Sequence, residues 1–163
     1  MNNIHPLAHL EDNVPISVGD RVQIHSFASV GTQPFSYDRS PHATLIRKNA
    51  ARGVVLGDDV ELMSHSNVDR GIERDTTIGR GTKIDHYAHV GHDSVLGEDV
   101  IVCAQAFIGG YVEVGDGAYL GAQCSIKPRV NIGARAKVGI GAVVLKDVPP
   151  GSTVVGNPAR ILP

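Results

Sequence analysis

A period of six residues runs through the second half of this chain and limits the folds open to it. Read in sixes from Ile78, the first position of twelve successive units, as far as Val144, is always isoleucine, valine or leucine. Glycine fills eight of the twelve second positions, and every fifth position is threonine, alanine, serine, valine or cysteine. This period matches neither the repeat of an α-helix nor the alternation of an ordinary strand. A regular internal repeat of this kind is typical of a fold built from stacked units.

Six residues suffice for a short extended segment followed by a tight corner. The aliphatic first residue then points inward, a small residue fits the corner, and neighbouring glycines permit the sharp turn. Three such sides close a triangular coil, in which residues three units apart stack on adjacent rungs about 4.8 Å from one another. We therefore predict an all-β fold, a parallel β-solenoid stabilised by contacts between neighbouring rungs.

The chain of 163 residues is long enough for one domain and too short for two ordinary ones. We expect a single β-solenoid domain over residues 1–163, with the first coils in 1–30 and the main coils in 54–146. Residues 31–53 break the repeat and predict a protruding loop, and residues 147–163 predict a C-terminal cap. Only ten residues separate Val68 from Ile78, which predicts an insertion at one corner, near residues 73–77.

Charge and cysteine content limit the binding partners and the cellular compartment that we expect for this chain. A net charge of −2 gives no general attraction to nucleic acid or to a membrane. Cys103 and Cys124 are too few for a disulfide framework, which favours the cytoplasm. The N-terminus has no basic region followed by an apolar stretch, and no run approaches the length of a membrane span, so we expect neither a signal peptide nor membrane insertion.

Three of the eight histidines, His86, His89 and His92, fall in the segment KIDHYAHVGHDSVLGED. Histidine suits proton transfer because its pKa lies near working pH. One rung after His92 the solenoid places Gly110, whose missing side chain leaves the backbone N–H accessible. A base and a free amide would then meet on neighbouring rungs, whereas a histidine at a corner can also be an ordinary polar surface residue.

The repeat resembles the hexapeptide-repeat acyltransferases, whose fold is a left-handed parallel β-helix and which work as homotrimers. Within them, the stretch GVVLGDDVELMSHSNVDRGIERDTTIGRGTKID and the segment HVGHDSVLGED resemble the UDP-3-O-acylglucosamine N-acyltransferases. The ending VVGNPARIL instead resembles sugar acetyltransferases that use acetyl-CoA. The uridine-binding domain and the C-terminal helical extension of the first group have no counterpart here, and one of its histidines falls on Arg129. We therefore expect a smaller acyl donor and a different sugar.

The resemblance assigns roles to individual residues. It implies that His92 is the catalytic base and that the Gly110 N–H stabilises the oxyanion. Either Asp93, the neighbour in sequence, or Asp85, which matches an IDN segment of the family, orients the imidazole. His86 and His89 are expected to contact substrate or a trimer interface, and plain exposure is the alternative.

Two stretches without acidic residues are candidate sites for anionic ligands. In Gly117–Lys146, the resemblance favours Lys127, Arg129 and Lys146 as contacts to acetyl-CoA or another acyl-CoA. In Arg39–Gly57, within the loop, Arg39 is a candidate to bind a diphosphate. Earlier in the loop, Phe35 and Tyr37 are candidates to stack on a base or sugar, or else to pin the loop to the coil. An ordinary solvated face remains the alternative for both stretches.

The sequence thus predicts a trimeric acyltransferase that moves an acyl group, acetyl for preference, from coenzyme A to a sugar, nucleotide-linked for preference, in surface polysaccharide synthesis. An acyl-carrier-protein-dependent N-acyltransferase of lipid A type is the nearest alternative. γ-Class carbonic anhydrases share the fold and bind zinc through three histidines, but a ligand position falls on Gly97 here, so no metal is expected. A non-catalytic binding solenoid is the last alternative.

Overall fold

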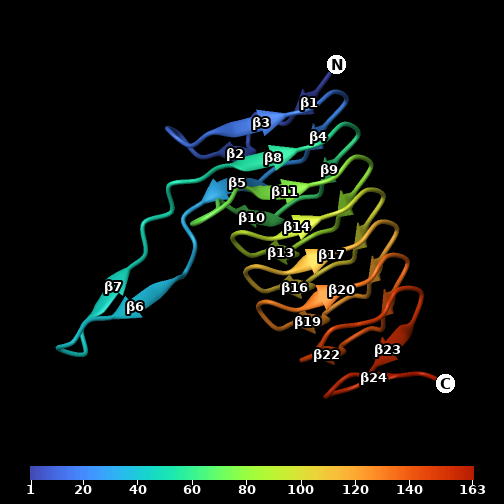
Figure 1. The fold of residues 1–163 in the computed structure, drawn as a ribbon. Helices are drawn as coiled ribbons and strands as arrows, with labels where there is room; N and C mark the ends of the chain where they lie inside the picture. The colour runs from blue at the N-terminus through green and yellow to red at the C-terminus, as the bar shows by residue number, and fades with distance from the viewer.

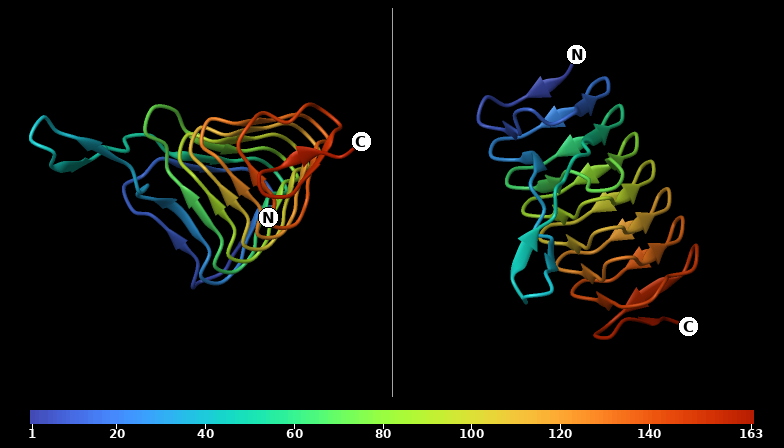
Figure 2. Two further views of the ribbon diagram at one scale, coloured as in Figure 1. Left: turned by 90° about the horizontal axis from the view of Figure 1, so that it is seen from below. Right: turned by 60° about the vertical axis from the view of Figure 1, so that its left-hand side comes forward.

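The computed structural model describes residues 1–163, and its only regular secondary structure is short β-strands joined by tight turns. These strands follow one another around a coil of triangular outline that descends from the N-terminus to the C-terminus (Figure 1; Figure 2, left). Strand pairing is parallel except in a hairpin and between the last two strands. The predicted all-β solenoid is therefore confirmed.

Three sheets form the sides of the coil. The nine-stranded sheet contains, in spatial order, β1 (Asn3–Ile4), β4 (Gln23–Ile24), β9 (Glu61–Leu62), β12 (Lys83–Ile84), β15 (Ile101–Val102), β18 (Tyr119–Leu120), β21 (Lys137–Val138), β23 (Thr153–Val155) and β24 (Arg160–Ile161). The seven-stranded sheet contains β2 (His9–Leu10), β5 (Ser29–Thr32), β10 (Asn67–Asp69), β13 (His89–Val90), β16 (Phe107–Ile108), β19 (Ser125–Ile126) and β22 (Val143–Val144). The six-stranded sheet contains β3 (Ile16–Val18), β8 (Val54–Leu56), β11 (Thr76–Ile78), β14 (Val95–Leu96), β17 (Glu113–Val114) and β20 (Asn131–Ile132).

The repeat positions fill the inside of the coil. Every aliphatic first position from Ile78 to Val144 is at most 3 % exposed, and every small fifth position from Thr82 to Val148 is at most 4 % exposed. All of them except Thr82 and Ser94 join one continuous hydrophobic core along the axis. Because burying each aliphatic side chain contributes about 1.5–3 kcal/mol, the stack of rungs supplies most of the driving force for folding.

Glycine at the second position serves close packing between rungs and not the turn itself. A Cβ on Gly79 would lie 2.4 Å from the carbonyl oxygen of Gly97, and one on Gly91 would lie 2.8 Å from the amide nitrogen of Gly110. The left-handed backbone falls two positions later, for example at Asp93 and Tyr111, each with φ of 61°. The expectation that neighbouring glycines permit the turn therefore holds for Gly81, Gly117 and Gly141, which have a positive φ at this position, and not for the second-position glycines.

The turns that lead from the seven-stranded to the six-stranded sheet are here called the His92 corner. They comprise residues 11–15, 33–53, 70–75, 91–94, 109–112, 127–130 and 145–147. The longest of these turns carries the hairpin of β6 (Tyr37–Arg39) and β7 (Leu45–Arg47), which extends away from the coil (Figure 2). The predicted loop and the predicted insertion thus lie on the same edge of the molecule.

The turn with the insertion spans residues 70–75, which overlaps the predicted position near 73–77; Thr76 and Thr77 already belong to β11. Asn67 pairs with His89, 22 residues on, whereas Thr77 pairs with Val95, 18 residues on. Four extra residues therefore lie in this one turn.

At the C-terminal end, β23 continues the nine-stranded sheet in parallel to β21, and β24 turns back antiparallel to it. The structure contains no helix with the length and apolar character needed to traverse a membrane.

Candidate active site

His92 and Asp93 form a hydrogen-bonded pair at the centre of the His92 corner. The His92 Nδ1 lies 2.6 Å from the Asp93 Oδ2, with 17 % of the His92 side chain exposed and none of the Asp93 side chain. An ionised carboxylate only accepts hydrogen bonds, so the proton of the neutral imidazole sits on Nδ1. The Nε2 atom is then the free base, the nitrogen that can take a proton from another molecule.

Asp93 is kept ionised although it is buried. Burial by itself would raise the pKa of its carboxyl group, but hydrogen bonds from the backbone of Arg74, from His92 and from the backbone of Ile72 and Glu73 outweigh it, and the pKa is lowered. The Oδ1 accepts the amides of Glu73 and Arg74, each at 2.7 Å, and the Oδ2 accepts the amide of Ile72 at 3.0 Å. The inserted turn therefore wraps the carboxylate in backbone N–H groups.

Gly110 lies directly against the open nitrogen of His92, one rung below. A Cβ on Gly110 would lie 2.8 Å from the Nε2 and 2.8 Å from the Cε1 of His92. The amides on either side of Gly110 are used within the coil: Gly109 N donates to Ile126 O and Tyr111 N donates to His92 O. The Gly110 N–H donates to no atom of the protein. Gly110 is the third residue of its six-residue unit, and the amides at this position donate to no backbone carbonyl in the other regular units of the coil. At Glu98, which has the same position, the amide donates to the Asp116 carboxylate.

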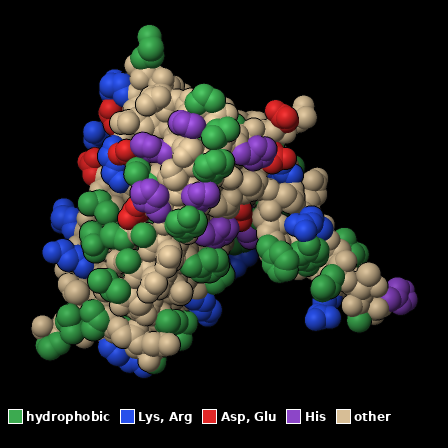
Figure 3. All heavy atoms as spheres, turned by 180° about the vertical axis from the view of Figure 1, so that it is seen from behind, with side chains coloured by type: hydrophobic (Ala, Val, Ile, Leu, Met, Phe, Trp, Pro, Cys, Tyr) green, Lys and Arg blue, Asp and Glu red, His purple; other side chains and the backbone are tan.

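A groove of about 480 Å³ opens over this pair and is lined by Thr32, Gln33, Phe35, Asn67, Asp69, His89, Gly91, His92, Phe107, Gly110 and Pro128. Its walls come from the seven-stranded sheet, from the His92 corner and from the start of the protruding loop. Seen from behind, histidine side chains gather on one face of the coil, and one lies at the tip of the hairpin (Figure 3); of them, His89 and His92 line the groove. The groove gives a second molecule access to both His92 and Gly110.

His89 is held in the wall of the groove by polar neighbours. Its Nδ1 lies 3.2 Å from the Asn67 Nδ2, its Nε2 lies 3.5 Å from the Asp69 Oδ2, and its ring stacks on Phe107 at 5.3 Å. Burial lowers the pKa of His89, the Asp69 charge raises it and His92 lowers it, and the net direction is down. Since the Asn67 amide donates to Nδ1, the neutral ring carries its proton on Nε2, toward Asp69.

Tyr111 and Arg129 stack below His92 on the side of the six-stranded sheet. The Tyr111 ring meets the His92 imidazole edge-on at 5.1 Å, and the Arg129 guanidinium lies 4.0 Å from the centre of the Tyr111 ring. Arg129 forms no ion pair with Asp147, whose carboxylate accepts the amide of Asn131. Arg129 therefore presents a free guanidinium edge beside the site.

Asp85 and His86 lie at a different corner, between the nine-stranded and seven-stranded sheets. The Asp85 Oδ1 accepts from the His86 amide and lies 2.7 Å from its Nδ1. Within one chain, therefore, Asp93 and not Asp85 contacts the His92 imidazole. His86 does not line the groove.

The remaining predicted residues divide between the groove and its surroundings. Phe35 lines the groove, whereas Tyr37 and Arg39 lie on the hairpin, where Arg47 contacts both the ring and the hydroxyl of Tyr37. Lys127 is exposed one rung below Gly109, and Lys146 lines a hollow of about 510 Å³ at the C-terminal end of the coil. The structure shows no group of three histidine, cysteine, aspartate or glutamate side chains placed to hold a metal ion.

Sequence reasoning missed the residues that support the histidines. The Ile72, Glu73 and Arg74 amides act through backbone atoms, which leave no signature in residue type. The contacts of Asn67 and Asp69 with His89 were not predicted, because the four-residue insertion changes the spacing between stacked residues from 18 to 22. The spacing between Val68 and Ile78 is the one signal that locates this irregular turn.

Comparisons with known proteins agree with this fold. The bacterial transferase hexapeptide model (six repeats) matches residues 75–110. The UDP-3-O-acylglucosamine N-acyltransferase of Azorhizobium caulinodans is 52 % identical over 143 residues, which cover 88 % of this chain and 40 % of that protein. This chain thus spans about two fifths of the length of the curated relatives it matches.

Solved structures show the same architecture. A crystal structure of UDP-N-acetylglucosamine acyltransferase superposes with a TM-score of 0.79 and 28 % identity, over 98 % of this chain and 61 % of that one. LpxA from Acinetobacter baumannii has a TM-score of 0.76 and 20 % identity, over 99 % and 71 %. The chain therefore has the left-handed parallel β-helix fold, and the hexapeptide model matches part of its repeat. Its predicted resemblance to the hexapeptide-repeat acyltransferases, and to the UDP-3-O-acylglucosamine N-acyltransferases among them, is confirmed.

Proposed function

We propose that this protein transfers an acyl group from a thioester to an amino or hydroxyl group of a sugar. The observation that carries the proposal is the placement of a free imidazole nitrogen, His92 Nε2, against an unpaired backbone amide, Gly110 N–H, at the floor of an open groove. One group is suited to remove a proton and the other to hold a developing negative charge. The names of the relatives describe the same class of reaction.

In the proposed reaction the acceptor nitrogen or oxygen attacks the thioester carbonyl carbon, and His92 Nε2 takes the proton of the nucleophile. The Gly110 N–H donates to the oxyanion of the tetrahedral intermediate. Asp93 stabilises the imidazolium through Nδ1. The intermediate collapses as the C–S bond breaks, and the imidazolium returns its proton to the departing thiolate.

Two candidate functions differ in the molecule that carries the acyl group, coenzyme A or acyl carrier protein. Coenzyme A with a short acyl group is our first candidate, with Lys127, Arg129 and Lys146 as contacts to its phosphates and a nucleotide-linked sugar as acceptor in surface polysaccharide synthesis. An acyl-carrier-protein-dependent N-acyltransferase acting on UDP-3-O-acylglucosamine is the second, and the names of the relatives favour it. Both candidates use the same base and amide.

The test measures the thiol released from two thioester donors, acetyl-CoA and an acylated acyl carrier protein. Each donor is combined with a panel of amino sugars and UDP-linked amino sugars. Wild-type protein should release thiol only with an acceptor present, and His92→Ala should lower kcat by about 100-fold or more. Thiol release from the acylated carrier protein, with none from acetyl-CoA, would select the second candidate. An unchanged rate in His92→Ala would remove His92 as the base.

Assembly is part of the proposal, because the groove of a single chain is open to solvent along one side of the coil. We expect a homotrimer, as in the family that the chain resembles, and light scattering of the purified protein measures its mass. Stoichiometric zinc in metal-free buffer would instead favour a carbonic-anhydrase-like site. No thermal shift with any acyl donor would favour a binding solenoid without catalysis.

A further inference from the structure

Arg74, in the inserted turn of the His92 corner, stands out because three of its groups contact residues of the rungs below. Its amide donates to the Asp93 Oδ1 at 2.7 Å, and its Nε donates to the Asp93 backbone carbonyl at 2.8 Å. Its Nη1 pairs with the Glu113 carboxylate at 2.9 Å, one rung farther down. The side chain therefore ties the inserted turn to two successive rungs.

Asp93 has a φ of 61°, the left-handed conformation that this turn position also has at Tyr111 one rung below. What distinguishes Asp93 is the number of groups that contact it. Its amide donates to the Thr76 hydroxyl at 2.9 Å, so with Arg74 every polar group of Asp93 has a partner. The direction of its carboxylate is then set by the insertion and not by the repeat.

The inserted turn is itself closely packed. A Cβ on Gly71 would lie 1.6 Å from the Arg74 carbonyl oxygen, and the Arg52 amide donates to the Gly71 carbonyl. The turn is thus braced against the base of the protruding loop, and its amides have little freedom to move away from Asp93.

We infer that Arg74 is a positioning residue, which acts through Asp93 to hold the His92 imidazole with its Nε2 over Gly110. This inference rests on the proposed function for its catalytic consequence, but its structural part concerns the His92–Asp93 hydrogen bond alone. A misplacement of a catalytic group by about 1 Å can lower the rate by about 100-fold. The loss of the Arg74 contacts that hold Asp93 should therefore have a measurable effect on the rate.

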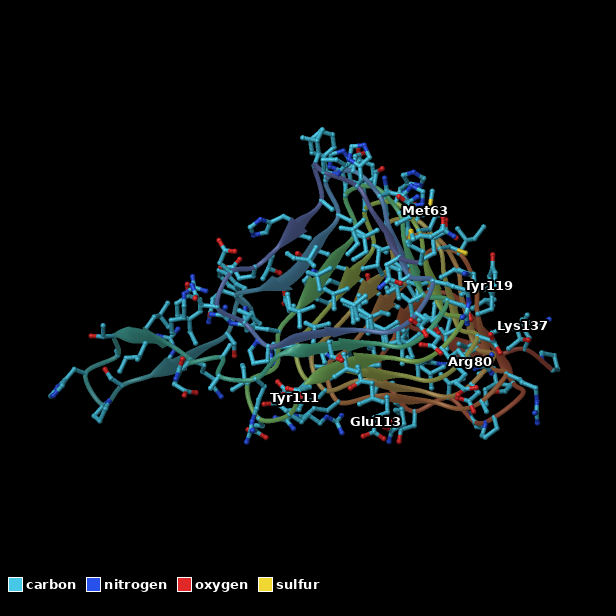
Figure 4. The ribbon with its side chains drawn as sticks, turned by 90° about the horizontal axis from the view of Figure 1, so that it is seen from above. Met63, Arg80, Tyr111, Glu113, Tyr119 and Lys137 are labelled. Atoms are coloured by element: carbon cyan, nitrogen blue, oxygen red, sulfur yellow. The ribbon has the colours of Figure 1, made fainter.

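The test replaces Arg74 by methionine, which keeps an unbranched apolar stem and removes the guanidinium. Arg80→Met is the matched control, because the Arg80 Nη2 makes an ion pair with Glu98 at 2.7 Å on the neighbouring rung, at another corner. Figure 4 shows Arg80 at a distance from Tyr111 and Glu113, which lie along one side of the coil. Arg74→Met loses the ion pair with Glu113, and Arg80→Met loses those with Glu98 and Asp99. Only Arg74→Met also loses a side-chain hydrogen bond to Asp93, from Nε to the backbone carbonyl.

The first readout is the proton NMR signal of the His92 Nδ1–H, which a short hydrogen bond to a carboxylate moves far downfield. Arg74→Met should shift this signal upfield or broaden it by faster exchange with water, and Arg80→Met should leave it unchanged. An unaltered signal in Arg74→Met would overturn the inference. This measurement needs no substrate, so it remains decisive even if the proposed acyl transfer is not found.

The second readout is kinetic. Arg74→Met should lower kcat by about tenfold while KM for donor and acceptor stays unchanged, because only the placement of the base is altered. In an Asp93→Asn background the same substitution should cost less than about twofold, since the two residues act as one unit. Equal losses in both backgrounds would show that Arg74 acts independently of Asp93 and would reject the inference.

Discussion

The His92 imidazole faces Gly110 of the next rung so closely that a single methyl group on Gly110 would lie 2.8 Å from the Nε2. The two residues are 18 positions apart, one full turn of the coil, and come from neighbouring turns of the same corner. The proposed base and the proposed oxyanion donor are therefore brought together by the stacking of rungs and not by a local motif.

Gly110→Ala should abolish acyl transfer while leaving the fold intact. The added methyl group would cover the Nε2, and we expect kcat to fall by about 100-fold or more. Alanine already occupies the same turn position at Ala104 and Ala122, so the backbone accepts it. Activity and thermal melting of the variant measure the two effects. Ala122→Gly is the matched control and should leave activity unchanged; a fully active Gly110→Ala would contradict the placement.

Asp93→Asn should destabilise the protein by about 1–3 kcal/mol at pH 7, because an amide cannot satisfy three backbone donors and His92 as a carboxylate does. The folded-state pKa of Asp93 is lowered. Its ionisation therefore stabilises the fold above the unfolded-state pKa of about 3.9, and this contribution is lost as pH falls toward the lower folded value.

Urea unfolding of wild type and Asp93→Asn at a series of pH values measures this difference. The gap between the two proteins should be constant near neutral pH and should narrow below about pH 4. Asp38→Asn, at an exposed carboxylate on the hairpin, serves as the control and should change stability little. A gap that stays constant down to acid pH would show that Asp93 is not ionised in the folded protein.

His89 should stay neutral to lower pH than an ordinary histidine. Burial is the main cause, and His92 adds to it, so the pKa lies below the usual value of about 6.5. Asp69→Asn removes the one charge that raises this pKa, and the NMR titration midpoint of His89 should fall further. His42, at the tip of the hairpin, provides an exposed reference in the same spectrum. A midpoint that rises in Asp69→Asn would contradict this arrangement.

The two cysteines should differ in reactivity. Burial raises the pKa of the Cys124 thiol to about 12, and its side chain is inside the coil. Cys103 is partly exposed on the outside. A thiol reagent at pH 8 should therefore modify one cysteine in the folded protein and both after unfolding in urea. Mass spectrometry identifies the modified residue, and rapid labelling of Cys124 without unfolding would refute the burial.

The period of six was sufficient to predict which residues fill the core. It placed the aliphatic series from Ile78 to Val144 inside the coil, and all of these residues are buried. It also placed Gly110 beside His92, because nearest-neighbour stacking transmits the register without error through regular turns. These successes share one cause: each depends only on the position of a residue within a repeat.

The repeat gave less information wherever the chain departs from it. A register of 18 would set His89 beside Gly71, but the insertion sets it beside Asn67. The choice between Asp85 and Asp93 depended on the contacts at each corner, where Asp85 lies against His86 and Asp93 against His92. Backbone amides, which hold Asp93, cannot be read from residue types. The irregular turns therefore had to be seen in the structure.

The close approach of the rungs has a consequence for the history of such proteins. A solenoid can lengthen by duplicating whole turns at either end, because each new turn needs only its neighbour to be stable. A turn duplicated between His92 and Gly110 would separate them by an extra layer of backbone and would leave the imidazole facing a different residue. Growth of the coil is therefore compatible with this chemistry above His92 or below Gly110, and incompatible with it between the two.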